Sequence, residues 1–219
     1  VLRPIYRWSR KVVMSFKRLD DSLRIIGPDQ IYDEGYYSKR REDPWRSDAQ
    51  NVATVLDDYF TPNSVIDFGC AIGAYLEPFH DSDVSIKGIE GNSDAFAHAV
   101  VPQDYLEKYD LRDQYMPDQS YDLALCFELA EHIPEKYADN LVESLIMSSD
   151  IVVMTAAPPG QGGTHHVNEQ PPDYWHRKFE SRGFEYDSEA VQTLSNRIEV
   201  EEASWIQENL MVFQSETNT

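Results

Sequence analysis

Residues 64–73, with the sequence SVIDFGCAIG, constrain the fold of this chain more than any other segment. An apolar run ends in Asp67 and is followed by a turn bracketed by Gly69 and Gly73, after which a helix-like pattern begins. This order is typical of a buried strand that leads through a tight loop into a helix, where an open α/β sheet binds a cofactor. Glycine lets the backbone approach a ligand closely because it has no Cβ. A plain strand–turn–helix connection, with Asp67 capping the helix, is the alternative interpretation.

Acidic residues follow two later strand-like segments at the corresponding place. Glu90 ends the segment 84–90, seventeen residues after Gly73, and Asp110 with Leu111 follows a third segment. A carboxylate at the tip of the second strand accepts hydrogen bonds from both ribose hydroxyls in dinucleotide-binding folds. The positions of Glu90 and Asp110 therefore favour a ligand that contains a ribose.

Strand-like and helix-like segments alternate along the chain. The alternation predicts an α/β fold with a doubly wound, Rossmann-like sheet that is mostly parallel and has a C-terminal antiparallel hairpin strand. At 219 residues the chain has the size of one such domain with short additions. The expected strands are 64–68, 84–90, 104–109, 121–127, 150–155, 184–190 and 210–214, and the expected helices are 48–60, 74–79, 94–100, 134–148 and 172–182.

The motifs occur in an order that resembles a known family. Residues 67–73, Glu90, the pair Asp110 and Leu111, and residues 121–132 (YDLALCFELAEH) resemble the successive motifs of class I S-adenosylmethionine-dependent methyltransferases. The resemblance runs from about residue 50 to about residue 186. Ala71 stands where the loop of this family often has glycine. The resemblance implies S-adenosyl-L-methionine as the cofactor.

The same resemblance implies which residues bind the cofactor. The Gly69 loop would face its methionine part, Glu90 its ribose, and Asp110 with Leu111 its adenine. The full set implied by the resemblance is Asp67, Gly69, Cys70, Ala71, Gly73, Glu90, Gly91, Asp110, Leu111, Phe127 and Glu128.

Two polar clusters qualify for catalysis of methyl transfer to a hydroxyl, which needs a base to remove a proton. The first holds Glu131 and His132 after the fourth strand; His132 is alternatively a structural helix cap. The second is the glycine-rich loop 158–170, where His166 or His165 is the preferred base and hydrogen bonding to the core is the alternative. No metal is predicted, because adjacent histidines rarely face one ion and no His-x-x-x-His pattern occurs.

The segment before the first strand divides into a basic part and an aromatic part. Residues 1–24 hold seven basic and two acidic residues, with aromatic and apolar residues interleaved at roughly helical spacing, which predicts a basic helix that binds an anionic partner or packs on its own domain. In the resembled family the following segment covers the cofactor, and Tyr32, Tyr36 and Tyr37 would form this lid; packing of each tyrosine on the core is the alternative. We therefore expect an N-terminal helix and lid in residues 1–47 and a Rossmann-like methyltransferase domain in residues 48–219.

Composition limits the partners. The chain has 39 acidic and 19 basic residues, a net charge of −20, which argues against nucleic acid and is compatible with a salt-loving host. No apolar run approaches the ~20 residues of a membrane span, and no signal peptide is evident. The two cysteines, Cys70 and Cys126, form no zinc or disulfide pattern, so a cytoplasmic location is expected.

These observations lead to one main hypothesis and two alternatives. The main hypothesis is O-methylation of a small-molecule or sugar-like acceptor. Phe127-Glu128-Leu129 stands where amino-directed DNA methyltransferases have Asn/Asp-Pro-Pro-Tyr, which argues against nucleic acid bases as acceptors. The alternatives are an RNA methyltransferase that uses the basic N-terminal helix and a non-catalytic methyltransferase-like binding protein. The sequence does not define the oligomeric state.

Overall fold

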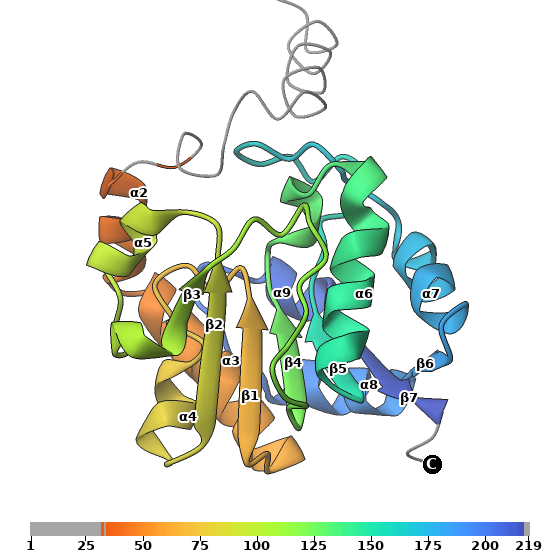
Figure 1. Cartoon of the computed structure of the whole chain (residues 1–219), viewed down its shortest axis with the longest axis horizontal. Helices are drawn as coiled ribbons and strands as arrows, with labels where there is room; N and C mark the ends of the chain where they lie inside the picture. Colours follow the sequence, from red (N-terminus) through yellow and green to blue (C-terminus); the bar gives the residue numbers. More distant parts are fainter. Residues whose placement is uncertain (1–31, 33, 217–219) are drawn as a thin grey trace, which may run out of the picture.

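A seven-stranded sheet forms the centre of the computed structural model, which describes residue 32 and residues 34–216 (Figure 1). The basic helix predicted in residues 1–24 lies outside the described residues. The strand order is β3-β2-β1-β4-β5-β7-β6, in which the first five are parallel and β7 is antiparallel to both of its neighbours. The strands are β1 (Ser64–Phe68), β2 (Ser85–Glu90), β3 (Leu106–Lys108), β4 (Leu123–Cys126), β5 (Ile151–Met154), β6 (Phe184–Tyr186) and β7 (Met211–Ser215).

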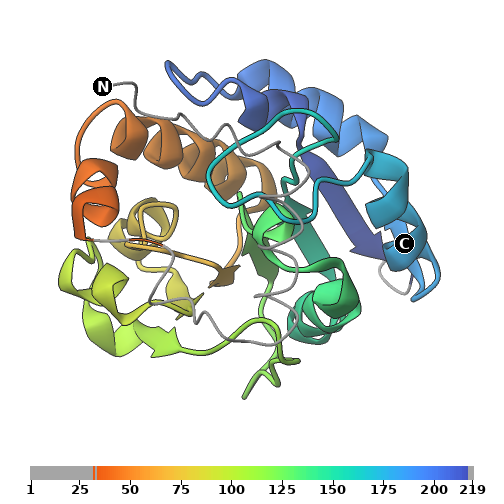
Figure 2. The ribbon, with the colours of Figure 1, turned by 90° about the horizontal axis from the view of Figure 1, so that it is seen from above.

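Helices cover both faces of the sheet, as the view from above shows (Figure 2). One face carries α3 (Trp45–Phe60), α4 (Glu77–Asp81), α8 (Ser188–Arg197) and α9 (Trp205–Glu208). The other face carries α6 (Ala138–Ser148) and α7 (Pro172–Glu180). The short helices α2 (Glu34–Arg40) and α5 (Ser93–Ala97) pack together through Tyr37 and Ala95. Within the described residues, the model contains no helix with the length and apolar character needed to cross a bilayer.

The alternation of side chains along β1 divides the core between the two faces. Val65 packs with the helices around α3, while Ile66 and Phe68 pack with those around α6. On α3 the fully buried Leu56 completes the Val65 side. Burying a side chain of this size stabilises the fold by about 1.5–3 kcal/mol. The sheet is therefore held by apolar layers on both faces, which fix the positions of its strand ends.

The chain order of the parallel strands creates a switch point beside β1. From β1 the chain proceeds outward to β2 and β3, then returns to the other side of β1 to form β4 and β5. Because the connections leave β1 and β4 in opposite directions, a crevice opens at the carboxyl ends of these strands. Figure 1 shows α2 and the loop between β5 and α7 at this same end of the sheet. The topology therefore brings the predicted motif loops to one edge.

The predicted fold class is confirmed, with differences in its helices. The C-terminal strands pair antiparallel as expected, but residues 188–197 form α8 instead of extending the strand predicted at 184–190. The Asp187 carboxylate caps this helix by accepting a hydrogen bond from the Ala190 backbone at 2.8 Å. The helix expected at 74–79 is instead α4, which begins at Glu77 after a series of turns. The helix α9 was not predicted.

Candidate active site

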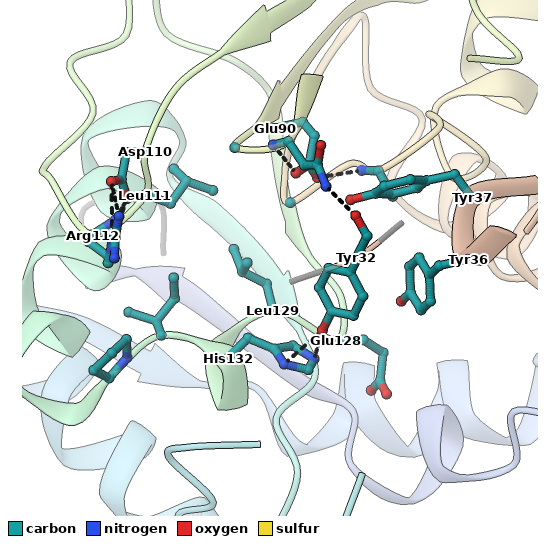
Figure 3. Close-up of a pocket in the computed structure, with 16 residues that line it drawn as sticks. Tyr32, Tyr36, Tyr37, Glu90, Asp110, Leu111, Arg112, Glu128, Leu129 and His132 are labelled. Atoms are coloured by element: carbon teal, nitrogen blue, oxygen red, sulfur yellow. Dashed lines mark hydrogen bonds and ion pairs between the residues drawn. The ribbon is translucent and has the colours of Figure 1, made fainter. Parts of the chain in front are cut away.

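A cleft with an empty volume of about 820 Å³ lies at the switch point (Figure 3). Its walls are the loops that follow β1, β2, β3 and β4, and the tyrosines in and before α2. Eight of the residues that line it were predicted from the sequence as cofactor-binding or catalytic: Gly69, Ala71, Glu90, Gly91, Asp110, Leu111, Glu128 and His132. Tyr32, Tyr36 and Tyr37, predicted as a lid, line it as well. The cleft is therefore built mainly from the motif loops at the carboxyl edge of the sheet.

The loop after β1 passes close to the loop after β4. Gly69 has a φ of +76° and donates its backbone N–H to the Ile89 carbonyl at 2.8 Å. A Cβ on Gly69 would lie 3.0 Å from the Leu129 side chain, and the positive φ would strain any other residue. Because glycine has no side chain, this position adds no bulk to the floor of the cleft. Gly73 also has a positive φ, +80°, but lines neither this cleft nor its neighbour.

Asp67 lies beneath this loop as a fully buried carboxyl group. Among the described residues, neither of its oxygens has a hydrogen-bond partner. Burial raises the pKa of Asp67 to about 8, and the nearby charge of Glu90 adds to the shift. An unsatisfied buried carboxyl group costs free energy, so its presence at the switch point indicates a functional role.

Glu90 joins the loops that follow β1 and β2. Its Oε2 accepts the backbone N–H of Ala71 at 3.0 Å, and its Oε1 accepts that of Asn92 at 2.8 Å. Each carboxylate oxygen has a second lone pair, so Glu90 can accept further hydrogen bonds from a ligand in the cleft. Asn92 also donates its side-chain amide to the Tyr32 carbonyl at 3.1 Å. Glu90 thus faces the cleft from a fixed position.

The loop after β3 supplies an apolar side chain and an ion pair. The Asp110 carboxylate accepts hydrogen bonds from the Arg112 guanidinium at 2.6 and 2.9 Å, which fixes its orientation. Leu111, which lies between these two residues in the sequence, is buried and lines the cleft together with Leu129 and Ile133. This end of the cleft is a mainly apolar slot with a carboxylate at its rim (Figure 3).

The loop after β4 begins at Glu128, which has a φ of +52°. Its carboxylate accepts hydrogen bonds from the Thr155 hydroxyl at 2.9 Å and the Trp205 indole N–H at 2.6 Å. Burial raises the pKa of Glu128 above its ordinary value, and these two hydrogen bonds partly offset the effect. Glu128 therefore connects the cleft to β5 and α9.

Glu128 also lines a second cavity of about 720 Å³, which shares several residues with the first. Cys70 and Phe127, both selected from the sequence, lie in this second cavity. Arg40 lines it too, with its guanidinium 4.7 Å from the Tyr36 ring centroid and 4.5 Å from that of Trp45. Among the described residues, Arg40 forms no ion pair with an acid, so its charge is available to a ligand.

The two catalytic clusters predicted from the sequence meet in the fold. The ring centroids of His132 and His166 are 5.0 Å apart, and Glu131 lies beside them. Of the four predicted catalytic residues, His132 lines the cleft, whereas Glu131, His165 and His166 do not. The backbone N–H groups of Val167 and Asn168 donate to the Glu131 carbonyl at 2.9 and 3.0 Å, which attaches the second loop to the first.

Burial keeps both residues of the first cluster neutral. Burial lowers the pKa of His132 to about 3, with the charge of His166 adding to the effect. Burial raises the pKa of Glu131 to about 8, with the charge of Glu128 adding to it. Among the described residues, no group hydrogen-bonds to the Glu131 carboxyl oxygens. Near neutral pH this corner of the site therefore holds a neutral imidazole and a largely protonated carboxyl group.

A cover of aromatic side chains closes one side of the cleft. Tyr32 and Tyr36 stack with ring centroids 4.3 Å apart, and Tyr37 is buried beside them. The Tyr32 hydroxyl reaches across to His132, 3.1 Å from Nδ1 and 3.4 Å from Nε2 (Figure 3). All three rings line the cleft, and Tyr37 also packs in a buried cluster with Ile72 and Ala95.

Sequence analysis did not select three polar residues of the site. Asn92 carries a local signal, since it precedes Ser-Asp at the start of α5 and caps it. Arg112 also carries one, because it lies two residues after Asp110. Arg40 carries no local sequence signal, because it reaches the site only through the packing of α2 near the strand ends.

The comparisons with known proteins agree with this geometry. A family model described as Methyltransferase domain matches residues 37–189. A search of curated proteins found no match. Because the family model covers more than half of the chain, the chain belongs to this family, and it is an S-adenosylmethionine-dependent methyltransferase of class I.

Several solved structures share the fold at low sequence identity. The sugar N-methyltransferase KedS8 from Streptoalloteichus sp ATCC 53650 is 12% identical with a TM-score of 0.62, over 87% of this chain and 94% of that chain. The amino pentose methyltransferase CalS10 from Micromonospora echinaspora, solved with S-adenosylmethionine, is 15% identical with a TM-score of 0.59, over 81% and 94%. Magnesium protoporphyrin IX methyltransferase from Synechocystis PCC 6803, solved with S-adenosylhomocysteine, is 15% identical with a TM-score of 0.56, over 94% and 100%.

Proposed function

We propose that the cleft binds S-adenosylmethionine and that the protein methylates a hydroxyl group of a small or sugar-like acceptor. The observation that carries the proposal is the meeting of the Gly69 loop, Glu90 and Asp110 at the switch point of the sheet. Bound there, the cofactor supplies an electrophilic methyl group on a positively charged sulfur. The protein has to hold this group in line with the acceptor oxygen and keep water away.

The nucleoside half of the cofactor fits the part of the cleft between β2 and β3. Glu90 accepts hydrogen bonds from the two ribose hydroxyls in addition to those from the backbone. Leu111, Leu129 and Ile133 provide apolar contacts for the adenine ring. Asp110, which Arg112 holds in place, accepts a hydrogen bond from the exocyclic amine of adenine.

The charged half fits the junction of the two cavities. Burial, and to a smaller extent repulsion from Glu90, raises the pKa of Asp67 beneath the Gly69 loop, and Glu128 lies in both cavities beside this loop. A ligand with a sulfonium and an ammonium group would relieve this repulsion. The Arg40 guanidinium is then the partner for the ligand carboxylate. The stacked rings of Tyr32 and Tyr36 offer π faces to the sulfonium.

The acceptor fits the corner beside His132. The His165 carbonyl lies 3.2 Å from His132 Nδ1 and can only accept, which favours a proton on Nδ1; the Nε2 lone pair then faces the Tyr32 hydroxyl, 3.4 Å away. A hydroxyl acceptor must lose a proton, whereas an uncharged amine already offers a lone pair. The polar groups gathered at His132 therefore favour an oxygen acceptor. We assign His132 the position next to the acceptor, with His166 and Glu131 behind it.

Calorimetry and product analysis test this proposal together. We expect the purified protein to bind S-adenosylmethionine and S-adenosylhomocysteine, and to transfer a radiolabelled methyl group to hydroxyl-bearing small molecules or sugars. The matched acceptors are amino sugars of the same ring, and single-stranded RNA serves as a third class. Absence of cofactor binding would refute the cleft assignment, while a methyl group found on nitrogen or on RNA would refute the acceptor assignment.

A further inference from the structure

One carboxyl group and two imidazoles meet behind the wall of the cleft. The ligand-capable atoms of Glu131, His132 and His166 all lie within 4.8 Å of one another. Glu131 and His132 are neighbours in a 3₁₀ turn after β4, whereas His166 belongs to the loop after β5. We propose that these three side chains bind one divalent transition-metal ion, such as Zn²⁺, Co²⁺ or Mn²⁺.

The spacing of the three atoms suits such an ion. When three atoms lie within 4.8 Å of one another, some point lies within about 2.8 Å of each, because 4.8 Å divided by √3 is about 2.8 Å. Bonds from zinc to imidazole nitrogen and carboxylate oxygen are about 2.0–2.2 Å long. A movement of about 0.6–0.8 Å by each side chain therefore gives normal bonds. This is within the range of small rotamer adjustments.

Both imidazoles are oriented as metal ligands usually are. His132 Nδ1 is held by the His165 carbonyl at 3.2 Å, and His166 Nδ1 is held by the Glu169 carboxylate at 3.2 Å. Glu169 is itself fixed by the backbone N–H groups of Gly160 and Gly162, at 2.8 and 2.7 Å. In metal sites a ligating histidine donates its other ring nitrogen to a carbonyl or carboxylate in this way. This leaves Nε2 of His166 as its ligand atom; Nε2 of His132 would become the second when the Tyr32 hydroxyl, 3.4 Å from it, turns aside.

Glu131 provides the independent sign that a cation belongs here. Its side chain has no solvent exposure, and no described residue donates a hydrogen bond to either oxygen. Buried carboxyl groups in proteins are normally paired, hydrogen-bonded or bound to a metal. No described side chain pairs with Glu131; the backbone N–H groups of Glu131 and Ala157 lie near its carboxyl group without a hydrogen bond of normal geometry, and burial keeps the group protonated when no cation is bound. A metal ion bridging Glu131 to the histidines would satisfy it.

The donor set favours a transition metal over Mg²⁺ or Ca²⁺. Two imidazole nitrogens and one carboxylate oxygen suit Zn²⁺, Co²⁺ and Mn²⁺, whereas Mg²⁺ and Ca²⁺ prefer oxygen ligands alone. Three protein ligands leave coordination positions open for water or substrate. This prediction differs from the absence of a metal expected from the sequence, because its ligands come from two separate loops.

The location gives the ion a role that rests on the proposed function. His132 lines the cleft, so an ion on its Nε2 is within reach of the acceptor corner. An acceptor hydroxyl bound at an open position would be held in a fixed orientation and would ionise more easily. The binding of the ion itself does not depend on this role.

Metal titration of the untagged, full-length chain tests the site. After removal of metals with a chelator, we expect calorimetry with Zn²⁺, Co²⁺ and Mn²⁺ to give one ion per chain, with Mg²⁺ binding much more weakly. The Co²⁺ form should show visible absorption bands that are sensitive to imidazole ligation. Glu131→Gln and His166→Gln should each weaken binding at least about tenfold, and Glu169→Gln by about 10- to 100-fold.

Controls separate this proposal from instability and from the cofactor assignment. His98→Ala, at the residue that follows α5 and outside the proposed ligand set, should bind metal like the wild type, and thermal unfolding checks that each variant is folded. Glu169→Gln leaves all three ligands in place, so it keeps the test valid if a ligand variant does not fold. Equal affinity in the wild type and Glu131→Gln, or no metal binding at all, would overturn the site. Cofactor titrations run separately, so loss of one kind of binding is distinguishable from loss of the other.

Discussion

At the residue scale, Asp67 and Glu90 carry similar carboxyl groups in different surroundings. Asp67 is fully buried without a partner among the described residues, and Glu90 is partly exposed and accepts two backbone hydrogen bonds. The difference arises from the strand ends: Asp67 lies within β1, while Glu90 is the last residue of β2. The protonation state of Asp67 therefore sets the charge beneath the cleft, and Glu90 presents a carboxylate to the interior of the cleft.

Glu90→Gln should weaken binding of S-adenosylmethionine by about 10- to 100-fold, because hydrogen bonds to a charged group contribute about 1.5–3 kcal/mol. Calorimetry measures the change. Glu185→Gln, on the exposed side of β6, is the matched control and should bind the cofactor normally. Unchanged affinity in a folded Glu90→Gln protein would remove Glu90 from the ribose site.

Asp67→Asn should change how stability depends on pH. The carboxyl group titrates near 3.8 when unfolded and near 8 in the cofactor-free fold, so within this window the folded state binds a proton that the unfolded state has lost. Because the unfolded state binds fewer protons there, the free energy of unfolding contributed by Asp67 falls as the pH rises. The contribution is favourable below this window and fully lost above a pH of about 8.

Relative to the wild type, the free energy of unfolding of Asp67→Asn should therefore rise by up to about 1.4 kcal/mol per pH unit between about pH 5 and 7. Urea denaturation at several pH values measures this difference. Asp57→Asn on α3 serves as the control, since this carboxyl group is not fully buried. A difference between Asp67→Asn and wild type that does not vary with pH would show that the carboxyl group is not buried in solution.

At the element scale, α2 and the loop after β5 are the parts that surround the site without belonging to the sheet. α2 is attached through Tyr37, which packs on Ile72 and Ala95. The loop after β5 is attached through the Glu131 carbonyl, which accepts from the backbone of Val167 and Asn168, while Glu169 bonds to two backbone N–H groups of the loop itself. Neither attachment is made to a strand, so α2 and this loop can move when a ligand binds while the sheet stays unchanged.

Binding of S-adenosylmethionine should slow amide hydrogen exchange in residues 34–40. The reason is that Tyr36 and Tyr37 line the cleft, so a ligand there adds contacts that must break before α2 opens. Exchange with and without cofactor, followed by mass spectrometry, measures the effect. The buried helix α6 provides the internal control. Equal protection of α2 in both states would mean that it does not act as a lid.

At the scale of the whole molecule, the net charge of −20 is the dominant property. Repulsion among like charges destabilises a compact state. Salt weakens this repulsion, because the screening length falls from about 10 Å at 0.1 M to about 3 Å at 1 M. The same charge opposes binding to nucleic acid, which would show a steep dependence on salt if residues 1–24 contacted phosphates.

The melting temperature should rise by at least about 3 °C between about 0.1 M and 1 M KCl, which corresponds to about 1 kcal/mol for a chain of this size. Differential scanning calorimetry measures the shift. Near the isoelectric pH of about 4.5 the net charge vanishes, so the same increase in salt should have a much smaller effect there. A melting temperature that falls with salt at neutral pH would contradict the importance of charge repulsion.

Local sequence patterns were enough to predict the main strands and the loops that reach the cleft. Apolar periodicity and glycine act locally, and a parallel sheet brings the ends of neighbouring strands to one edge. For this reason Gly69, Glu90 and Asp110 were selected without coordinates. The helices α8 and α9 were not, because weakly periodic segments become helical through their packing on the sheet.

Which distant side chains meet depends on how the elements pack together. Arg40 reaches the cleft through the packing of α2, and His166 reaches Glu131 and His132 because backbone hydrogen bonds join the two loops. Burial of Asp67, which raises its pKa, likewise depends on layers contributed by helices far away in sequence. Local patterns encode strand ends and turns, whereas distances between loops and the burial of a charge arise only when the whole core packs.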